Sequence, residues 1–157
     1  MGDRTSPTAT VLARHAAGMA AALSELIPLP LDPGRVRVHG SVCGAGIRLL
    51  RQVVLRLSRG RAVALGNHVF LPAGCEGDPA VLAHELTHCA QYQAWGPWRY
   101  YRRGAATQLR DLLHRGLGFG ISPYAYRHEA GRAFESYGME QQAQMVEDAV
   151  RGRQRFG

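Results

Sequence analysis

The sequence predicts one α+β domain that is mainly helical, with a few short strands placed ahead of its central helix. Apolar residues recur at helical spacing over several long segments, whereas polar and apolar residues alternate only in short stretches near 35–39 and 61–72. With 157 residues, the chain is long enough for one core of ordinary size. We therefore expect a single domain over residues 7–157, preceded by a flexible tail at 1–6.

The first half of the chain contains two predicted helices and one strand. A helix over 7–27 carries apolar residues at helical spacing and is ended by the two prolines of 28–30. Polar and apolar residues alternate over 35–39, which predicts a half-buried strand. The next helix spans 47–58, where the branched apolar residues share one face. The Val-Val-Leu run at 53–55 leaves a strand open as the alternative there.

The second half contains a hairpin followed by three helices. Two strand-like runs within 61–72 meet at Gly66-Asn67, a pair typical of tight turns. A helix over 78–94 follows the hairpin directly and is ended by a Gly-Pro pair. Further helices are expected over 102–115 and 139–154.

The helix over 78–94 holds a His-Glu-x-x-His motif. Asp78 suits its N-cap and Pro79 its first position, where a missing N–H costs nothing. Because four helical residues turn through about 400° and rise about 6 Å, His84 and His88 lie on one face and can bind the same metal ion. The rest of the helix is mostly apolar, so it should be buried, and buried imidazoles need partners. A metal ion would supply them.

The motif also supplies a candidate general base. Glu85 sits about 100° around the helix from His84, outside the first coordination shell. From there its carboxylate can reach a water molecule on the metal, which is where a general base must stand. The alternative is that both histidines are core residues with ordinary hydrogen bonds and that Glu85 is incidental.

A catalytic zinc site needs a third protein ligand. The metzincin continuation fails, because its glycine and third histidine would fall at Gln91 and Ala94. A glutamate from a later helix is the remaining common solution. Glu140 is favoured, because it opens a helix whose inner face is apolar, and Glu129 is the alternative. The other downstream glutamates are Glu135 and Glu147.

Further polar groups would complete such a site. A donor is required for the negative charge that develops on an attacked carbonyl. The candidates are Tyr124, Tyr126, Tyr137 and His128. Sequence does not rank these four, and we take Tyr126 as the working choice. Gln144 or Asp148 would orient the histidines by hydrogen bonds to the ring nitrogens that do not bind the metal.

Two groups of residues outside the motif are expected to be structural. Five aromatic residues crowd together after the motif helix, and we expect them to pack in the core rather than to form a substrate subsite. They are Tyr92, Trp95, Trp98, Tyr100 and Tyr101. Of the three cysteines, Cys89 should be a buried thiol, and a disulfide between Cys43 and Cys75 stays open.

The charge of the chain does not indicate a nucleic-acid partner. All 19 basic residues are arginine and the formal net charge is +7. The arginines are spread over 4–61, 99–115 and 127–155 without a nucleic-acid motif, which favours a solvated surface. No apolar run approaches the roughly 20 residues of a membrane span, and no convincing signal peptide is present. We expect a protein that is cytoplasmic or exported without a classical signal peptide.

Two stretches carry a resemblance to a known family. Residues 62–72 followed by Leu-Ala-His-Glu-Leu-Thr-His-Cys-Ala-Gln resemble the small His-Glu-Leu-Thr-His zinc metallopeptidase domains associated with bacterial contractile injection systems. Tyr124-x-Tyr126 and the segment 139–148 are similar to related His-Glu-x-x-His proteins. The likeness covers about 35–148. It departs from the family at Cys89, where an aliphatic residue is usual, and at the insertion-like segment 96–122, which keeps Glu129 open.

The resemblance implies a minimal thermolysin-like (gluzincin) zincin core, with Glu140 as third ligand beside His84 and His88. The expected function is zinc-dependent hydrolysis of peptide bonds, with Glu85 as general base and a peptide or protein as substrate. Components of a secretion or injection system are the expected partners. The alternative is a non-catalytic, zinc-stabilised docking module of such an assembly.

Overall fold

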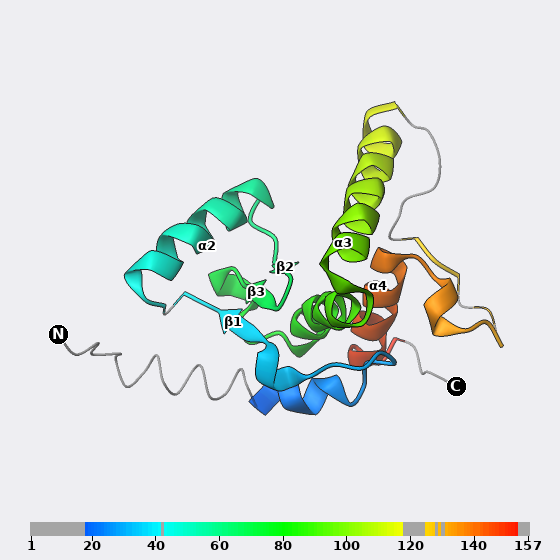
Figure 1. The fold of residues 1–157 in the computed structure, drawn as a ribbon, viewed down its shortest axis with the longest axis horizontal. Coiled ribbons are helices and arrows are strands. Elements are labelled where there is room, and N and C mark those ends of the chain that lie inside the picture. Colours follow the sequence, from blue (N-terminus) through cyan, green and yellow to red (C-terminus); the bar gives the residue numbers. More distant parts are fainter. Residues whose placement is uncertain (1–17, 42, 118–124, 128, 130, 154–157) are drawn as a thin grey trace.

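The computed structural model describes residues 18–41, 43–117, 125–127, 129 and 131–153. Within these ranges the fold is mainly helical with one small sheet, as predicted (Figure 1). The predicted tail and the first part of the helix expected over 7–27 lie outside the described residues. The described part of that helix covers residues 18–24.

Three short strands form the sheet in the order β1-β3-β2. Strand β1 (Arg37–His39) runs parallel to β3 (His68–Phe70), and β2 (Val63–Leu65) runs antiparallel to β3. The predicted hairpin is confirmed, because β2 and β3 join at Gly66, whose φ of 63° favours glycine. Strand β2 therefore lies at one edge of the sheet.

The first strand is shorter than predicted. Residues Pro33–Arg35 form a 3₁₀ turn instead of opening the strand. The side chain of Asp32 accepts a hydrogen bond from the backbone N–H of Gly34, which stabilises this turn. The polar and apolar alternation that marked the strand thus begins inside a turn.

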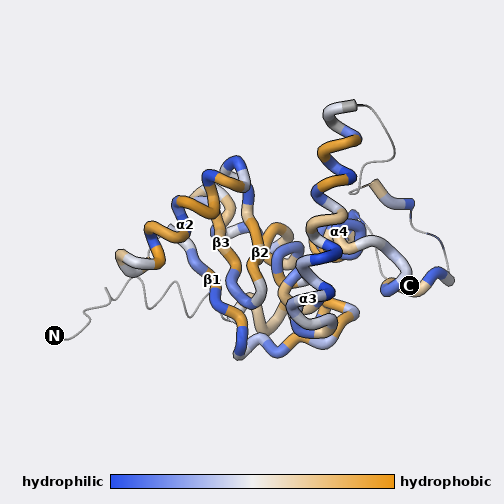
Figure 2. Tube along the Cα trace, turned by 45° about the horizontal axis from the view of Figure 1, so that its top comes forward, coloured by the Kyte–Doolittle hydropathy of each residue, from blue (hydrophilic) through white to orange (hydrophobic). Residues whose placement is uncertain are grey.

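Helix α2 (Ala45–Leu57) confirms the predicted helix and excludes the strand alternative for 53–55. It follows β1 and packs against β3, burying Val54. Much of its apolar surface stays exposed, including Leu57, which is 81% exposed. Figure 2 shows apolar positions along α2 as well as in the core.

Helix α3 (Pro79–Leu117) bends sharply at Gly96, which has φ 76° and ψ 164°. Two helices predicted to be separated by an irregular segment are instead joined at this single residue. The second one resumes at Pro97, not at Arg102, because proline is well placed in a first helical position. In Figure 1 the second half of α3 points away from the first.

The core lies where the sheet and the first half of α3 meet α4 (Met139–Val150). Leu82, Leu86, Val69 and Val146 are completely buried there. The motif helix is therefore held between β2 and β3 on one side and α4 on the other. None of the helices in the described part of the chain has the length and apolarity needed to cross a bilayer.

Candidate metal centre

The motif helix begins as its sequence predicts. Oδ1 of Asp78 accepts hydrogen bonds from the backbone N–H groups of Ala80 at 2.9 Å and Val81 at 3.3 Å. This cap satisfies two of the donors that a helix start leaves free. It also fixes where the helical repeat begins, and thereby which face carries His84 and His88.

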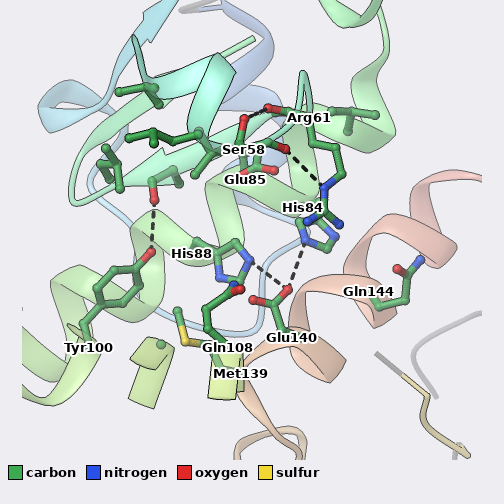
Figure 3. Close-up of a pocket in the computed structure, with 18 of the residues that line it drawn as sticks. Ser58, Arg61, His84, Glu85, His88, Tyr100, Gln108, Met139, Glu140 and Gln144 are labelled. Atoms are coloured by element: carbon green, nitrogen blue, oxygen red, sulfur yellow. Dashed lines mark hydrogen bonds and ion pairs between the residues drawn. The ribbon is translucent and has the colours of Figure 1, made fainter. Parts of the chain in front are cut away.

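His84, His88 and Glu140 converge on one point (Figure 3). One ligand atom from each of the three lies within 4.8 Å of the others. Nε2 of His84 is 3.7 Å from Oε2 of Glu140, and Nε2 of His88 is 3.5 Å from the same oxygen. Ligands about 2.0–2.1 Å from a tetrahedral zinc ion lie about 3.4 Å apart, so these spacings fit a metal of that size.

Glu129, the alternative third ligand, lies elsewhere. Its side chain is more than half exposed, and Oε1 is 3.4 Å from Nη1 of Arg132. Glu140 is 9% exposed and lies in the first turn of α4, where the helix packs on α3. The sequence argument that a glutamate opening this helix would point inward is thus confirmed for Glu140.

Each histidine is oriented by an acceptor on the side away from this point. Nδ1 of His84 donates to Oε2 of Glu147 at 3.0 Å, and Nδ1 of His88 donates to Oε1 of Gln91 at 2.8 Å. Because both acceptors require a proton on Nδ1, Nε2 of each neutral ring is left with a free lone pair. This is the arrangement that metal-binding histidines need.

The amide of Gln91 is itself held in one orientation. Its Nε2 donates to the backbone oxygen of Met139 and to Oε1 of Gln142, both at 2.9 Å. Gln142 in turn donates to the backbone oxygen of Tyr137 at 3.0 Å. With both amide protons used, Gln91 can present only its oxygen to His88.

Neither residue predicted to orient the histidines does so. Nε2 of Gln144 donates to Oδ1 of Asp148 at 3.3 Å, and the orienting positions belong to Glu147 and Gln91. From the sequence, Glu147 is a candidate only as a metal ligand. The sequence does contain one sign of this role. Glu140 and Glu147 are seven residues apart, about two helical turns, and therefore lie on the same face of α4.

The electrostatics of the cluster favour a cation between the histidines and Glu140. Burial disfavours the charged form of His84, but the neighbouring carboxylates of Glu140 and Glu147 outweigh it and raise its pKa to about 10. Burial alone would raise the pKa of Glu140, yet the adjacent His88 and His84 hold it well below its ordinary value. Positive charge is therefore stabilised at the point where the three ligand atoms meet.

Glu85 is buried beside the three ligands and lines the same cleft. Burial raises the pKa of its carboxyl group, and the neighbouring histidines offset only part of that rise. The backbone of Ala64 in β2 also lowers the pKa, but less than the histidines do. A carboxylate in such surroundings is a stronger base than an exposed one.

The three candidate ligands lie in a cleft of about 810 Å³. Its walls come from the end of α2, strand β2, both halves of α3 and one side of α4. Tyr100 is buried in this wall and its hydroxyl donates to the backbone oxygen of Ala64 at 3.3 Å. The outer edge of β2 is thus partly occupied by the protein's own side chains.

The aromatic cluster is only partly core, contrary to expectation. Tyr100 is 5% exposed, but Tyr101 is 49% and Trp98 is 78% exposed. Tyr100 and Tyr101 both line the cleft. The bend at Gly96 turns the helix that carries them outward, which sequence spacing did not reveal.

Tyr126 does not line the cleft in the described part of the chain. Its hydroxyl donates to Oδ2 of Asp148 at 2.7 Å. The hydroxyl of Tyr137 accepts from the backbone N–H of Glu129, and Tyr124 and His128 lie outside the described residues. The polar cleft residues that sequence reasoning missed are Ser58, Arg61 and Gln108. The Ser-Arg-Gly-Arg turn at 58–61, directly before the hairpin, was the one signal for Ser58 and Arg61.

The three thiols are free. Cys43 and Cys75 are partly exposed and form no disulfide. Cys89 is buried as predicted, and burial, helped by the charge of Glu85, raises its pKa to about 12.

Comparison with known proteins gives a match to a family model. Residues 29–96 match the family model of the eCIS core domain, a domain of extracellular contractile injection systems. The matched segment contains His84, Glu85 and His88 and ends before Glu140. No curated protein and no solved structure matches the chain. The match supports an association of this chain with contractile injection systems, in agreement with that part of the resemblance.

Proposed function

We propose that this chain is a zinc-dependent peptide hydrolase that works with a contractile injection system. One observation carries the proposal: two Nε2 atoms and one carboxylate oxygen converge in an open cleft, and both histidines are oriented by acceptors at Nδ1. Structural zinc sites are closed by four protein ligands, whereas catalytic sites keep one position open. Three converging ligands therefore favour the catalytic type.

His84, His88 and Glu140 would hold the metal. Two nitrogens and one carboxylate oxygen form a donor set that zinc commonly takes in hydrolases. When bound, zinc lowers the pKa of a water molecule in its open position and polarises a substrate carbonyl. Glu147 and Gln91 keep the two imidazole rings in the orientation that this binding requires.

Glu85 would move the proton. Its carboxylate accepts a proton from the attacking water and returns it to the amine nitrogen that leaves when the peptide bond breaks. The raised pKa of the buried carboxyl group supports this role, because a base acts best when its pKa approaches the working pH. The peptide would lie in the cleft that β2 and both halves of α3 line.

Glu85→Gln tests the proposal. The variant keeps all three ligands, so we expect unchanged zinc content by elemental analysis and an unchanged far-ultraviolet circular dichroism spectrum. Turnover of a peptide library, followed by mass spectrometry, should fall about 100-fold or more. Glu135→Gln, which changes an exposed carboxylate in the same way, should retain full activity. Equal turnover by Glu85→Gln and wild type would overturn the hydrolase proposal.

The extent of the family match favours a second candidate, a docking module that cleaves nothing. The matched segment 29–96 contains His84 and His88 but ends before Glu140, so the match covers only part of the ligand set. Zinc would then serve as a staple that contributes folding free energy. This candidate predicts no peptide turnover by the zinc-loaded wild type, together with loss of folded protein in His84→Ala.

A further inference from the structure

Two helical arms border the cleft that holds the metal centre. The first arm is α2 with its following turn (residues 45–61), and the second is the outer half of α3 (residues 97–117). The first arm contributes Val54, Leu57 and Arg61 to the cleft, and the second contributes Tyr101, Ala105 and Gln108. Figure 1 shows the arms on either side of β2.

The apolar walls continue along both arms beyond the cleft. Leu50 lies one helical turn before Val54, and Leu112 lies one turn after Gln108. They are 48% and 67% exposed. Of the eleven large apolar side chains exposed among the described residues, nine lie on the two arms. Scattered exposed leucines are ordinary, but a concentration of this kind marks a binding surface.

The arms also concentrate positive charge. They hold ten of the 19 arginines but only one of the twelve acidic residues, Asp111, which is buried. Arg51 and Arg103 are engaged elsewhere, on the backbone oxygen of Leu71 and over the ring of Trp95. The fold therefore places about half of the arginines around one cleft, although they are spread over several segments of the sequence.

Arg61 carries this charge into the cleft itself. Its Nε is 3.5 Å from the backbone oxygen of Ser58, and no acidic partner of Arg61 is found in the described part of the chain. Figure 3 shows its side chain extending on the same side of the cleft as His84. The guanidinium group can thus accept a carboxylate from a bound molecule.

We propose that the cleft between the two arms binds an extended, acidic and apolar peptide segment. Its apolar side chains lie against the arms, and one of its carboxylates pairs with Arg61. Nucleic acid would satisfy the arginines but would leave the leucines of both arms against water, so a peptide fits better. This inference rests on the proposed function, since the segment is then the substrate of the metal centre.

The test uses the zinc-loaded full chain carrying Glu85→Gln, so that binding is measured without cleavage. The probe is a fluorescein-labelled octapeptide of leucine and glutamate, followed by fluorescence anisotropy. We expect saturable binding that weakens at least threefold when the glutamates become glutamines, and again when the leucines become serines. Equal binding of the three peptides, or tighter binding of a labelled single-stranded oligonucleotide, would overturn the inference.

Variants on the first arm test which of its residues contact the bound peptide. In the same background, Arg61→Gln should weaken binding of the glutamate peptide roughly three- to fivefold and leave the glutamine peptide unaffected. Arg56→Gln removes the same charge from an exposed residue outside the cleft and should change little. Leu57→Ser should weaken binding of both peptides, whereas Leu26→Ser, at an exposed leucine outside both arms, should not. Equal effects of Arg61→Gln and Arg56→Gln would reject Arg61 as the contact.

Wild-type turnover separates this inference from the proposed function. Cleavage of leucine peptides without regard to their glutamates overturns the inference and leaves the hydrolase intact. Binding of the glutamate peptide to Glu85→Gln without any cleavage by the wild type overturns the hydrolase and keeps the binding surface.

Discussion

Nη2 of Arg151, directly after α4, lies 3.0 Å from Oδ2 of Asp78, the residue that caps α3. The same nitrogen is 3.0 Å from Oε1 of Glu147, whose other oxygen accepts from His84. One arginine therefore ties the start of the motif helix to the end of α4, the helix that carries Glu140. The position of His84 depends on both helices at once.

Glu147→Gln should weaken zinc binding by about tenfold. The glutamine can still accept from Nδ1 of His84, but it lacks the charge that makes the imidazole a stronger donor to the metal. Competition with a chromophoric zinc chelator measures the change. Glu135→Gln is the matched control and should bind zinc like the wild type. Equal affinity of both variants would show that Glu147 does not support the metal site.

Gln91→Ala should lower the free energy of unfolding of the metal-free protein by about 2–4 kcal/mol. The change leaves three buried groups without their partner: Nδ1 of His88, the backbone oxygen of Met139 and Oε1 of Gln142. Urea denaturation followed by circular dichroism measures it. Gln52→Ala, at an exposed position of α2, should have almost no effect. A loss below about 1 kcal/mol at Gln91 would contradict the network.

Local rules predicted the parts of the site that depend on one helix. The cap at Asp78 and the shared face of His84 and His88 follow from helical geometry alone. Glu140 was predicted because a helix start with an apolar inner face must point its first turn inward. Gln91 and Glu147 were missed, because their role depends on how α3 and α4 pack, which periodicity does not report.

The bend at Gly96 explains most of the remaining errors. Glycine followed by proline was correctly interpreted as a break, but sequence does not say whether a helix resumes at once or after a loop. Because it resumes at Pro97, Tyr101 is carried to the cleft and Trp98 to the surface. The direction of the second arm is set by the backbone at Gly96, and so is the position of the arginines that this arm carries.

Removal of metal should destabilise the protein in a way that zinc alone reverses. A ligand that binds only the folded state at about 1,000 times its dissociation constant adds about 4 kcal/mol, which corresponds to roughly 10 °C in Tm for a chain of this size. Differential scanning fluorimetry after chelation, with and without added zinc, measures the shift. Glu140→Gln should lose most of it. An unchanged Tm on zinc addition to the wild type would mean that the three ligands bind no metal.

Cys89 should resist thiol reagents in the folded protein at pH 8. Burial and the nearby charge of Glu85 raise its pKa to about 12, so the reactive thiolate is a fraction of about 10⁻⁴ at that pH, and the side chain has no exposed surface. The partly exposed Cys43 and Cys75 are free and should both react. Titration with Ellman's reagent should therefore count two thiols before denaturation and three after it.

Cys89→Ala provides the control for that assignment. Titration of this variant should count two thiols both before and after denaturation, because the substitution removes the thiol that does not react in the folded protein. A disulfide between Cys43 and Cys75 would instead leave no fast thiol in the native wild type and a single thiol after unfolding without reductant. Three fast thiols in the native protein would mean that the first half of α3 is not buried against the sheet, and the positions of His84 and His88 depend on that packing.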